Sequence, residues 1–145
     1  MWFPHLLQRR VKNPIQPSKG ESTPTPQSNP RNIYPKQVIT HFESKMFKRL
    51  EHAFPEHHLL AQVAFSALIT HDDMKIRNRF NRKVTDFVLL DQAYNVVVII
   101  ELDDPSHIGK EIEDAERDSM LHAAGYRVLR YTSIPSIRQL HKDVL

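Results

Sequence analysis

The pattern of apolar and polar positions predicts alternating helices and strands in the chain after residue 40. Apolar residues recur at helical spacing in three segments, and four short runs rich in aliphatic residues are typical of buried strands. The predicted helices cover residues 40–53, 111–124 and 133–145, and the predicted strands cover residues 59–65, 84–90, 96–102 and 126–131. The order is helix, strand, hairpin, helix, strand, helix, and it predicts a three-layer α/β domain within residues 36–145.

Local signals support these boundaries. Thr40 and Glu43 have the spacing of a capping box at the start of the first helix, and Pro55 follows its end. Only five residues separate the strands 84–90 and 96–102, so the two strands should form an antiparallel hairpin with Leu90 near Val96.

Residues 1–35 differ in composition from the rest of the chain. Seven of the ten prolines fall before residue 36, and residues 1–40 contain six basic residues against Glu21 alone. The rest of the chain carries 14 basic and 16 acidic residues, so the net charge of +3 comes from the N-terminal segment. Such a segment buries too little apolar area to offset its ordering entropy. We expect a disordered, proline-rich basic arm over residues 1–35, which could recruit a protein partner.

The composition excludes several kinds of site. The chain has no cysteine, so it holds no disulfide, cysteine zinc site or iron–sulfur cluster, and a reducing cytoplasm is the expected location. Three glycines are too few for a phosphate loop or a dinucleotide fingerprint. No apolar run approaches the ~20 residues of a membrane-spanning helix, so we expect no membrane span.

Three carboxylates interrupt or follow the apolar strands of the predicted hairpin. Asp86 lies within the first strand, and Glu101 and Asp103 lie at the end of the second. Antiparallel pairing across the short turn should place Asp86 opposite Ile100 or Glu101, which brings the carboxylates within reach of each other across the strands. Carboxylate oxygens of this kind suit a hard cation such as Mg²⁺ or Mn²⁺. The alternative is that they form ion pairs with nearby cations, namely Lys83, Arg117 and Arg130.

Two further features lie beside these carboxylates. His107 follows Asp103 in the next loop and could deprotonate a water molecule or bind a metal, although a lone loop histidine is commonly just solvated. Five cations lie within nine residues, in a segment that reads as a loop or a short helix: Lys75, Arg77, Arg79, Arg82 and Lys83. This run directly precedes the strand of Asp86, so it could contact a phosphate backbone, or it is an ordinary solvated loop.

Four motifs occur in order along the folded segment. They are Val-Thr-Asp-Phe-Val at 84–88, Ile-Ile-Glu-Leu-Asp-Asp-Pro-Ser-His at 99–107, Arg-Asp at 117–118, and Ala-Gly-Tyr-Arg-Val-Leu-Arg at 124–130. Residues 38–132 thereby resemble an uncharacterised domain family close to the very-short-patch-repair endonucleases, within the restriction-endonuclease-like PD-(D/E)xK superfamily. The resemblance implies an αβββαβ core with a mixed central sheet flanked by helices.

The resemblance also implies roles for individual residues. Asp86 and Glu101 would be the metal ligands, and Glu43 would match a first-helix glutamate that many members direct toward the site, although it is equally a capping-box residue. The lysine expected two residues after Glu101 is replaced by Asp103, as in the patch-repair-like branch, where a downstream histidine such as His107 is the candidate base. The supporting polar residues would be Gln62, Arg117, Asp118 and Arg130.

The leading hypothesis is a metal-dependent endonuclease acting on DNA, with Mg²⁺ or Mn²⁺ as cofactor. The missing motif lysine supports an alternative, a catalytically inactive nucleic-acid-binding module with the same fold. A third hypothesis is an accessory interaction protein in which the carboxylates are only structural. The sequence leaves the substrate strand, the number of metal ions and the oligomeric state open.

Overall fold

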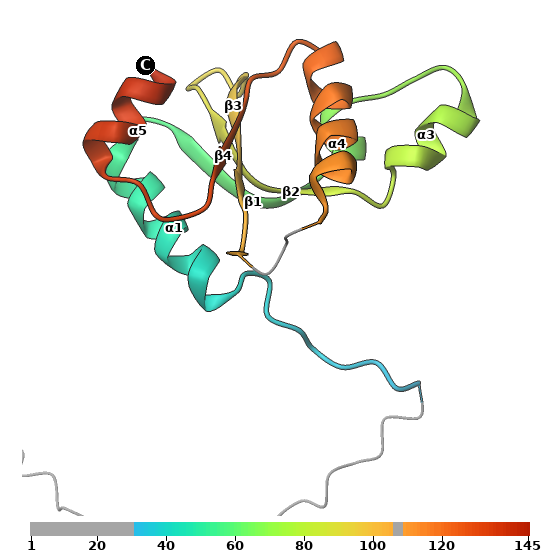
Figure 1. Ribbon diagram of the computed structural model, residues 1–145, viewed down its shortest axis with the longest axis horizontal. Coiled ribbons are helices and arrows are strands. Elements are labelled where there is room, and N and C mark those ends of the chain that lie inside the picture. The colour runs from blue at the N-terminus through green and yellow to red at the C-terminus, as the bar shows by residue number, and fades with distance from the viewer. Residues whose placement is uncertain (1–30, 106–108) are drawn as a thin grey trace, which may run out of the picture. The chain divides into compact units, whose positions relative to one another are not determined.

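The computed structural model describes residues 31–105 and 109–145, and its larger compact unit is Lys36–Leu145. The arm predicted over residues 1–35 lies almost entirely outside the described residues. In chain order the elements are α1 (His41–Ala53), β1 (His58–Ala64), α2 (Phe65–Leu68), α3 (Met74–Phe80), β2 (Val84–Leu90), β3 (Val96–Leu102), α4 (Glu111–Ala123), β4 (Val128–Tyr131) and α5 (Ile137–Val144) (Figure 1). The predicted order of elements is confirmed, and the ambiguous segment after β1 forms two short helices.

The four strands form one mixed sheet in the order β1-β2-β3-β4. The β1–β2 and β2–β3 pairs are antiparallel, whereas β3 and β4 are parallel and are joined through α4. Leu90 pairs with Val96 across the hairpin, as the sequence predicts, and Phe87 pairs with Ile100. Between these two pairs the register shifts by one residue at Leu89 and Leu90, and the shifted register places Asp86 opposite Glu101 at the end of the hairpin remote from its turn.

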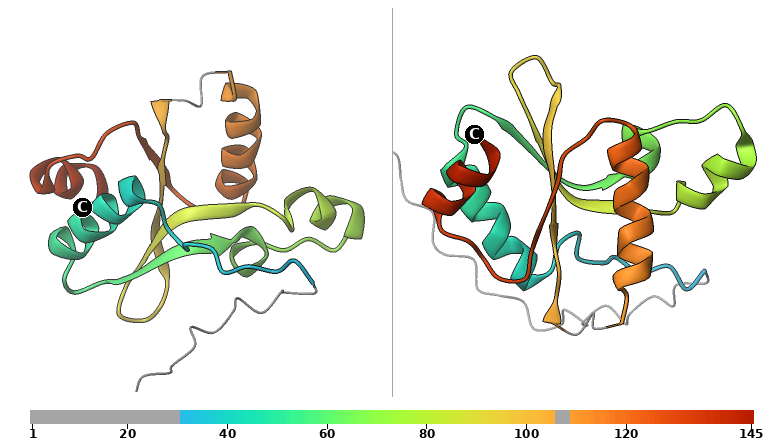
Figure 2. Two further views of the ribbon diagram at one scale, coloured as in Figure 1. Left: turned by 90° about the horizontal axis from the view of Figure 1, so that it is seen from below. Right: turned by 45° about the horizontal axis from the view of Figure 1, so that its top comes forward.

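Helices cover both faces of the sheet (Figure 2). On one face, Phe87 of β2 belongs to a cluster with Met46 of α1 and Leu140 of α5. On the other face, Val88 belongs to a separate cluster with Leu121 of α4. Because successive strand residues point to opposite faces, one uninterrupted apolar run in β2 supplies both cores.

Local backbone chemistry fixes where the helices begin and end. Thr40 accepts a hydrogen bond from the backbone of Glu43, whose carboxylate accepts one from the backbone of Thr40, so the predicted capping box is present. The strand predicted over 126–131 begins only at Val128. Gly125, at φ +89°, ends α4, and the N–H of Tyr126 still donates to the carbonyl of Leu121 in its last turn.

Candidate functional site

The end of the hairpin replaces ordinary strand pairing with carboxylate hydrogen bonds. The backbone N–H of Asp86 donates to Glu101 Oε2 at 3.1 Å, and the backbone N–H of Leu102 donates to Asp86 Oδ2 at 2.8 Å. Each carboxylate is therefore fixed by the backbone of the opposite strand. Counting along the sequence allowed Ile100 or Glu101 as the partner of Asp86, and the register shift between Leu89 and Leu90 makes it Glu101.

Burial makes this pair electrostatically costly. Glu101 is only 3% exposed, and it is one of two buried polar residues in the described chain. Burial, followed by the nearby charge of Asp86, raises the pKa of Glu101 to about 8. Burial also raises the pKa of Asp86, and the charge of Glu43 acts in the same direction. Two facing carboxylates with raised pKa values are the arrangement that a bound cation would relieve.

Arg117 of α4 offsets part of this charge. Its Nη2 lies 3.4 Å from Glu101 Oε1 and donates to the carbonyl of Val84 at 2.7 Å. Its guanidinium also lies 5.5 Å from the ring centroid of Phe65. These contacts hold Arg117 against the start of β2, but 3.4 Å is a long contact and leaves the carboxylate pair only partly neutralised.

Asp103 belongs to a second, better-paired group. Arg130 of β4 donates to Asp103 at 2.8 Å and makes two hydrogen bonds to Asp118, at 2.8 and 2.7 Å. Asp114 lies 3.8 Å from the same guanidinium. The hydrogen bonds that Arg130 donates to Asp118, together with the charge of that carboxylate, raise the pKa of Arg130 despite partial burial. The ion pair with Arg130 is the alternative that the sequence left open for Asp103.

Glu43 and Gln62 complete the surroundings of Asp86. The cross-strand pairs Ala61–Phe87 and Val63–Thr85 place Gln62 opposite Asp86. Gln62 has φ +56°, a conformation that a non-glycine residue in a strand rarely adopts, and its Nε2 lies 3.4 Å from Glu43 Oε1. Backbone strain of this kind is found at functional sites, where the surrounding structure enforces it. The hydrogen bond from Gln62 therefore connects the strained part of β1 to Glu43 of α1, the carboxylate whose charge acts on Asp86.

The positive φ of Gln62 predicts that glycine is more stable than alanine at this position, the reverse of the usual order in a strand. Glycine normally destabilises a strand by about 0.5–1 kcal/mol relative to alanine. At φ +56° we expect the opposite, so the Gln62→Gly variant should be more stable than Gln62→Ala by about 1 kcal/mol in urea denaturation. Ala61, the adjacent residue of β1, is the matched control, and Ala61→Gly should lower stability. Equal stability of the two Gln62 variants would show that the position is unstrained.

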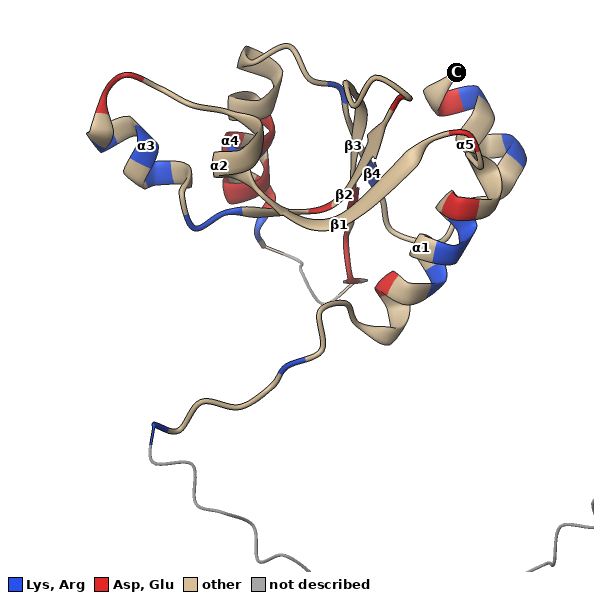
Figure 3. Cartoon of the chain, turned by 180° about the vertical axis from the view of Figure 1, so that it is seen from behind, with Lys and Arg blue, Asp and Glu red and all other residues tan. Residues whose placement is uncertain are grey.

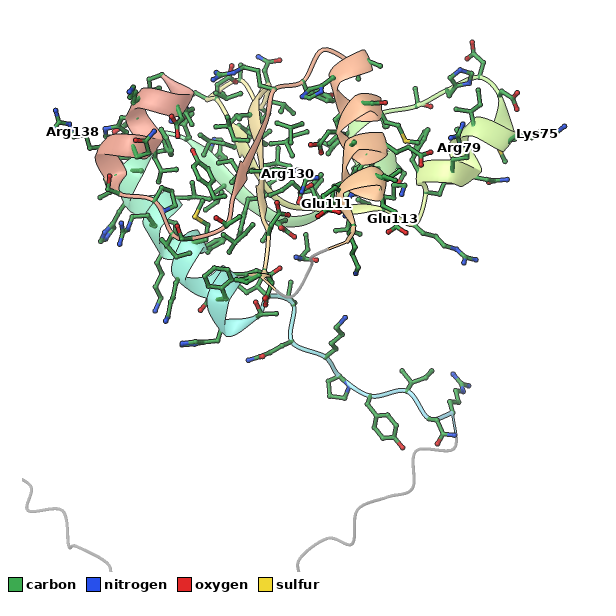
Figure 4. The ribbon with its side chains drawn as sticks, in the orientation of Figure 1. Lys75, Arg79, Glu111, Glu113, Arg130 and Arg138 are labelled. Atoms are coloured by element: carbon green, nitrogen blue, oxygen red, sulfur yellow. The ribbon has the colours of Figure 1, made fainter. Side chains whose placement is uncertain are left out.

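The carboxylates surround a hollow of about 190 Å³, here named the acidic hollow. Six carboxylate residues line it: Glu43, Asp86, Glu101, Asp103, Asp104 and Asp114. Among the described residues, the cationic ones that line it with them are Arg117 and Arg130. Figure 4 shows Arg130 beside the sheet, between β4 and the end of α4 that carries Glu111. The excess of carboxylates favours a cation over an anion in this hollow.

The donor set fits a magnesium-type cation with few protein ligands. Asp86 and Glu101 each use one carboxylate oxygen to accept a backbone N–H. A cation would bind through Oδ1 of Asp86 and through Oε1 of Glu101, which it would share with the long contact to Arg117. Mg²⁺ commonly takes one or two carboxylates and completes its shell with water and substrate phosphate. In the described ranges, no group of three or more His, Asp or Glu side chains is arranged to hold a metal, so the expected three-carboxylate set is not assembled.

The remaining predicted site residues are distributed as follows. His107 lies outside the described residues. Within the basic run, three cations lie on α3 and two in the loop before β2: Lys75, Arg77, Arg79, Arg82 and Lys83. Arg79 forms an ion pair with Glu116 of α4 at 2.5 Å. Sequence reasoning missed Asp114, although it precedes Arg117 by three residues and Asp118 by four, the spacing of one helix face.

Together, the fold and the site define a mixed α/β domain with a four-stranded mixed sheet flanked by helices and a carboxylate-lined hollow at the end of its hairpin. The chain belongs to the family described as Protein of unknown function (DUF2726), whose model matches residues 35–144. No curated protein and no solved structure matches it. Across the described residues, the helices are too short or too polar to cross a bilayer.

Proposed function

We propose that this domain is a metal-dependent phosphodiester hydrolase, an endonuclease acting on DNA, with the restriction-endonuclease-like αβββαβ core of the PD-(D/E)xK superfamily. The observation that carries the proposal is the pair of facing carboxylates, the partly buried Asp86 and the buried Glu101, side by side where β2 begins and β3 ends. The order of elements and the mixed sheet agree with that core. Buried charge that is only partly neutralised is destabilising, and such groups cluster at functional sites, which supports the proposal.

The proposed mechanism assigns roles to the residues of the acidic hollow. Asp86 and Glu101 would hold Mg²⁺ or Mn²⁺. When bound, this cation would polarise the scissile phosphate and lower the pKa of a bound water molecule. Glu43, held by Thr40 and Gln62, adds negative charge beside Asp86. Arg130 orients Asp103 through a hydrogen bond. Either Asp103 or His107 would orient or deprotonate the attacking water. Arg117 is the cation nearest the carboxylate pair and would stabilise the developing negative charge in place of the missing lysine.

One observation favours a second candidate function. Asp103 occupies the position of the motif lysine and is bound to Arg130, whose guanidinium also holds Asp118. A site that has exchanged its lysine for an ion-paired carboxylate can retain the fold and lose the reaction. The alternative is therefore a catalytically inactive nucleic-acid-binding or accessory interaction module with the same fold.

Cleavage assays test the proposed function directly. We expect the full chain to cleave at least one of supercoiled, linear duplex and single-stranded DNA when Mg²⁺ or Mn²⁺ is present. Removing the metal with EDTA should stop cleavage, and adding excess metal should restore it, because the hydrolytic water depends on the cation. Folded protein that cleaves none of the three with either metal would refute the hydrolase proposal and favour the inactive module.

A further inference from the structure

The outer side of α1 carries a row of basic residues that no role described so far explains. The row, here named the basic stripe, consists of Lys45, Lys48, Arg49 and His52. Their spacing of i, i+3, i+4 and i+7 places them on one face of the helix. Figure 3 shows Lys and Arg recurring along α1. With Ile134, these four side chains line a second hollow of about 340 Å³, so the concave lining is almost entirely basic.

The positive charge of the stripe is not cancelled locally. Within the described part of the chain, none of Lys45, Lys48 and Arg49 forms an ion pair with a carboxylate. Glu51, the acidic residue of the same turns, lines a different hollow with Phe54 and neighbouring residues. By contrast, Arg79 on α3 is paired with Glu116. The stripe also differs from the basic run in shape, because its four basic side chains line one hollow, whereas the hollow beside α3 contains only Arg79 of that run.

A phosphodiester substrate needs a basic surface outside the acidic hollow, because the hollow itself is rich in carboxylates. Six carboxylates against two arginines repel a polyanion, so its affinity has to come from cations outside the hollow. The first turn of α1 lines the acidic hollow through Thr40, Phe42 and Glu43, and the next turns line the basic one. At 1.5 Å per residue, the stripe begins about 3 Å beyond Glu43 along the helix axis and ends about 14 Å beyond it.

We infer that the basic stripe binds the phosphate backbone of the nucleic acid whose cleavage is proposed above, and this inference rests on that proposed function. At about 100° per residue, the stripe lies on the side of α1 turned away from Glu43, so a strand leaving the acidic hollow reaches it by crossing the first turn of α1. A membrane surface fits less well. The apolar residues Met46, Leu50 and Ala53 of α1 are buried in the core, which leaves no apolar face for insertion.

Salt-dependent binding tests the inference without requiring hydrolysis. The assay uses the full chain carrying Asp86→Asn and measures fluorescence anisotropy of labelled duplex and single-stranded DNA over a range of salt concentrations. The test variant adds Lys45→Gln and Lys48→Gln, which keep helix propensity and leave Arg49 bonded to the carbonyl of Pro135. The matched control adds Arg138→Gln and Lys142→Gln on the exposed side of α5 (Figure 4).

We expect the stripe variant to bind DNA at least roughly tenfold more weakly than the protein that carries Asp86→Asn alone. The slope of log affinity against log salt concentration should fall in magnitude by about two, one for each lost phosphate contact. The α5 control should change neither quantity appreciably. Equal losses in both variants, no loss in the stripe variant, or binding to phosphatidylserine vesicles in place of DNA would overturn the inference. Because binding and cleavage are measured separately, an inactive protein that binds DNA through the stripe would contradict only the proposed reaction.

Discussion

Replacing Asp86 with asparagine is expected to reduce metal-dependent DNA cleavage by about a thousandfold or more while leaving the fold intact. Asparagine keeps the size of the side chain and an oxygen that can accept the Leu102 N–H, but it removes the charge that would hold the cation. Metal-ion stabilisation of a developing charge is worth several kcal/mol, and each 1.4 kcal/mol is a factor of ten in rate.

The control for this variant is Asp72→Asn, the same chemical change at an exposed position in the loop before α3. Initial cleavage rates and thermal melting would be measured for both variants and the wild type. Removing one of two facing carboxylates relieves repulsion, so Asp86→Asn should melt no lower than the wild type. Retained cleavage in a folded Asp86→Asn protein would remove Asp86 from the reaction and with it the proposed metal site.

Replacing Glu101 with glutamine is expected to stabilise the metal-free protein at pH 8 while abolishing cleavage. The pKa of Glu101 rises from 4.5 to about 8 on folding, mainly because the side chain is buried and secondly because Asp86 is charged. Between these two values the folded protein binds a proton that the unfolded chain has released. Stability from this group is therefore complete below about pH 4.5, is lost as the pH rises, and is gone above about pH 8.

Glutamine stays neutral and escapes this loss, which accumulates at about 1.4 kcal/mol per pH unit across the window. Its single oxygen can still accept the N–H of Asp86, and Arg117 keeps its bond to the carbonyl of Val84. We expect the melting temperature of Glu101→Gln to exceed that of the wild type by about 5 °C or more at pH 8, with the difference shrinking toward pH 5.

Mg²⁺ provides an independent check on the same variant. A cation that binds only the folded protein raises its melting temperature, so Mg²⁺ should stabilise the wild type at pH 8 and leave Glu101→Gln unchanged. Calorimetry at pH 5 and pH 8, with and without Mg²⁺, measures both effects. A glutamine variant that melts below the wild type at pH 8 would mean that Glu101 is a satisfied structural carboxylate and does not bind a metal.

The candidate site was partly predictable because strand alternation and a short turn constrain a hairpin closely. Five residues between two apolar runs limit the register to within one residue, so counting along the chain places Asp86 opposite Ile100 or Glu101. The register shift between Leu89 and Leu90, which the count does not contain, places it opposite Glu101. The capping box at Thr40 and Glu43 was predictable for the same reason, since it depends on residues three apart. In both cases the interacting residues are close in sequence or lie on two strands joined by one short hairpin turn.

Other features depend on residues that are distant in sequence. No local pattern indicates that Arg130 of β4 binds Asp103 and Asp118, because the parallel pairing of β3 with β4 through α4 brings them together. The sequence of residues 59–65 predicts an ordinary strand and gives no sign of the positive φ of Gln62. The surrounding structure enforces that conformation, so local propensity carries no signal of it.

By itself the sequence determined the α/β class, the order of elements and the position of Asp86 opposite Glu101 to within one residue, because these follow from periodicity and short-range geometry. Only the tertiary structure decided which charges are paired. In the folded chain Asp103 is paired with Arg130, whereas Glu101 is buried with only a long contact to Arg117. Electrostatic energies depend on distance and burial, and both are set by how distant segments pack.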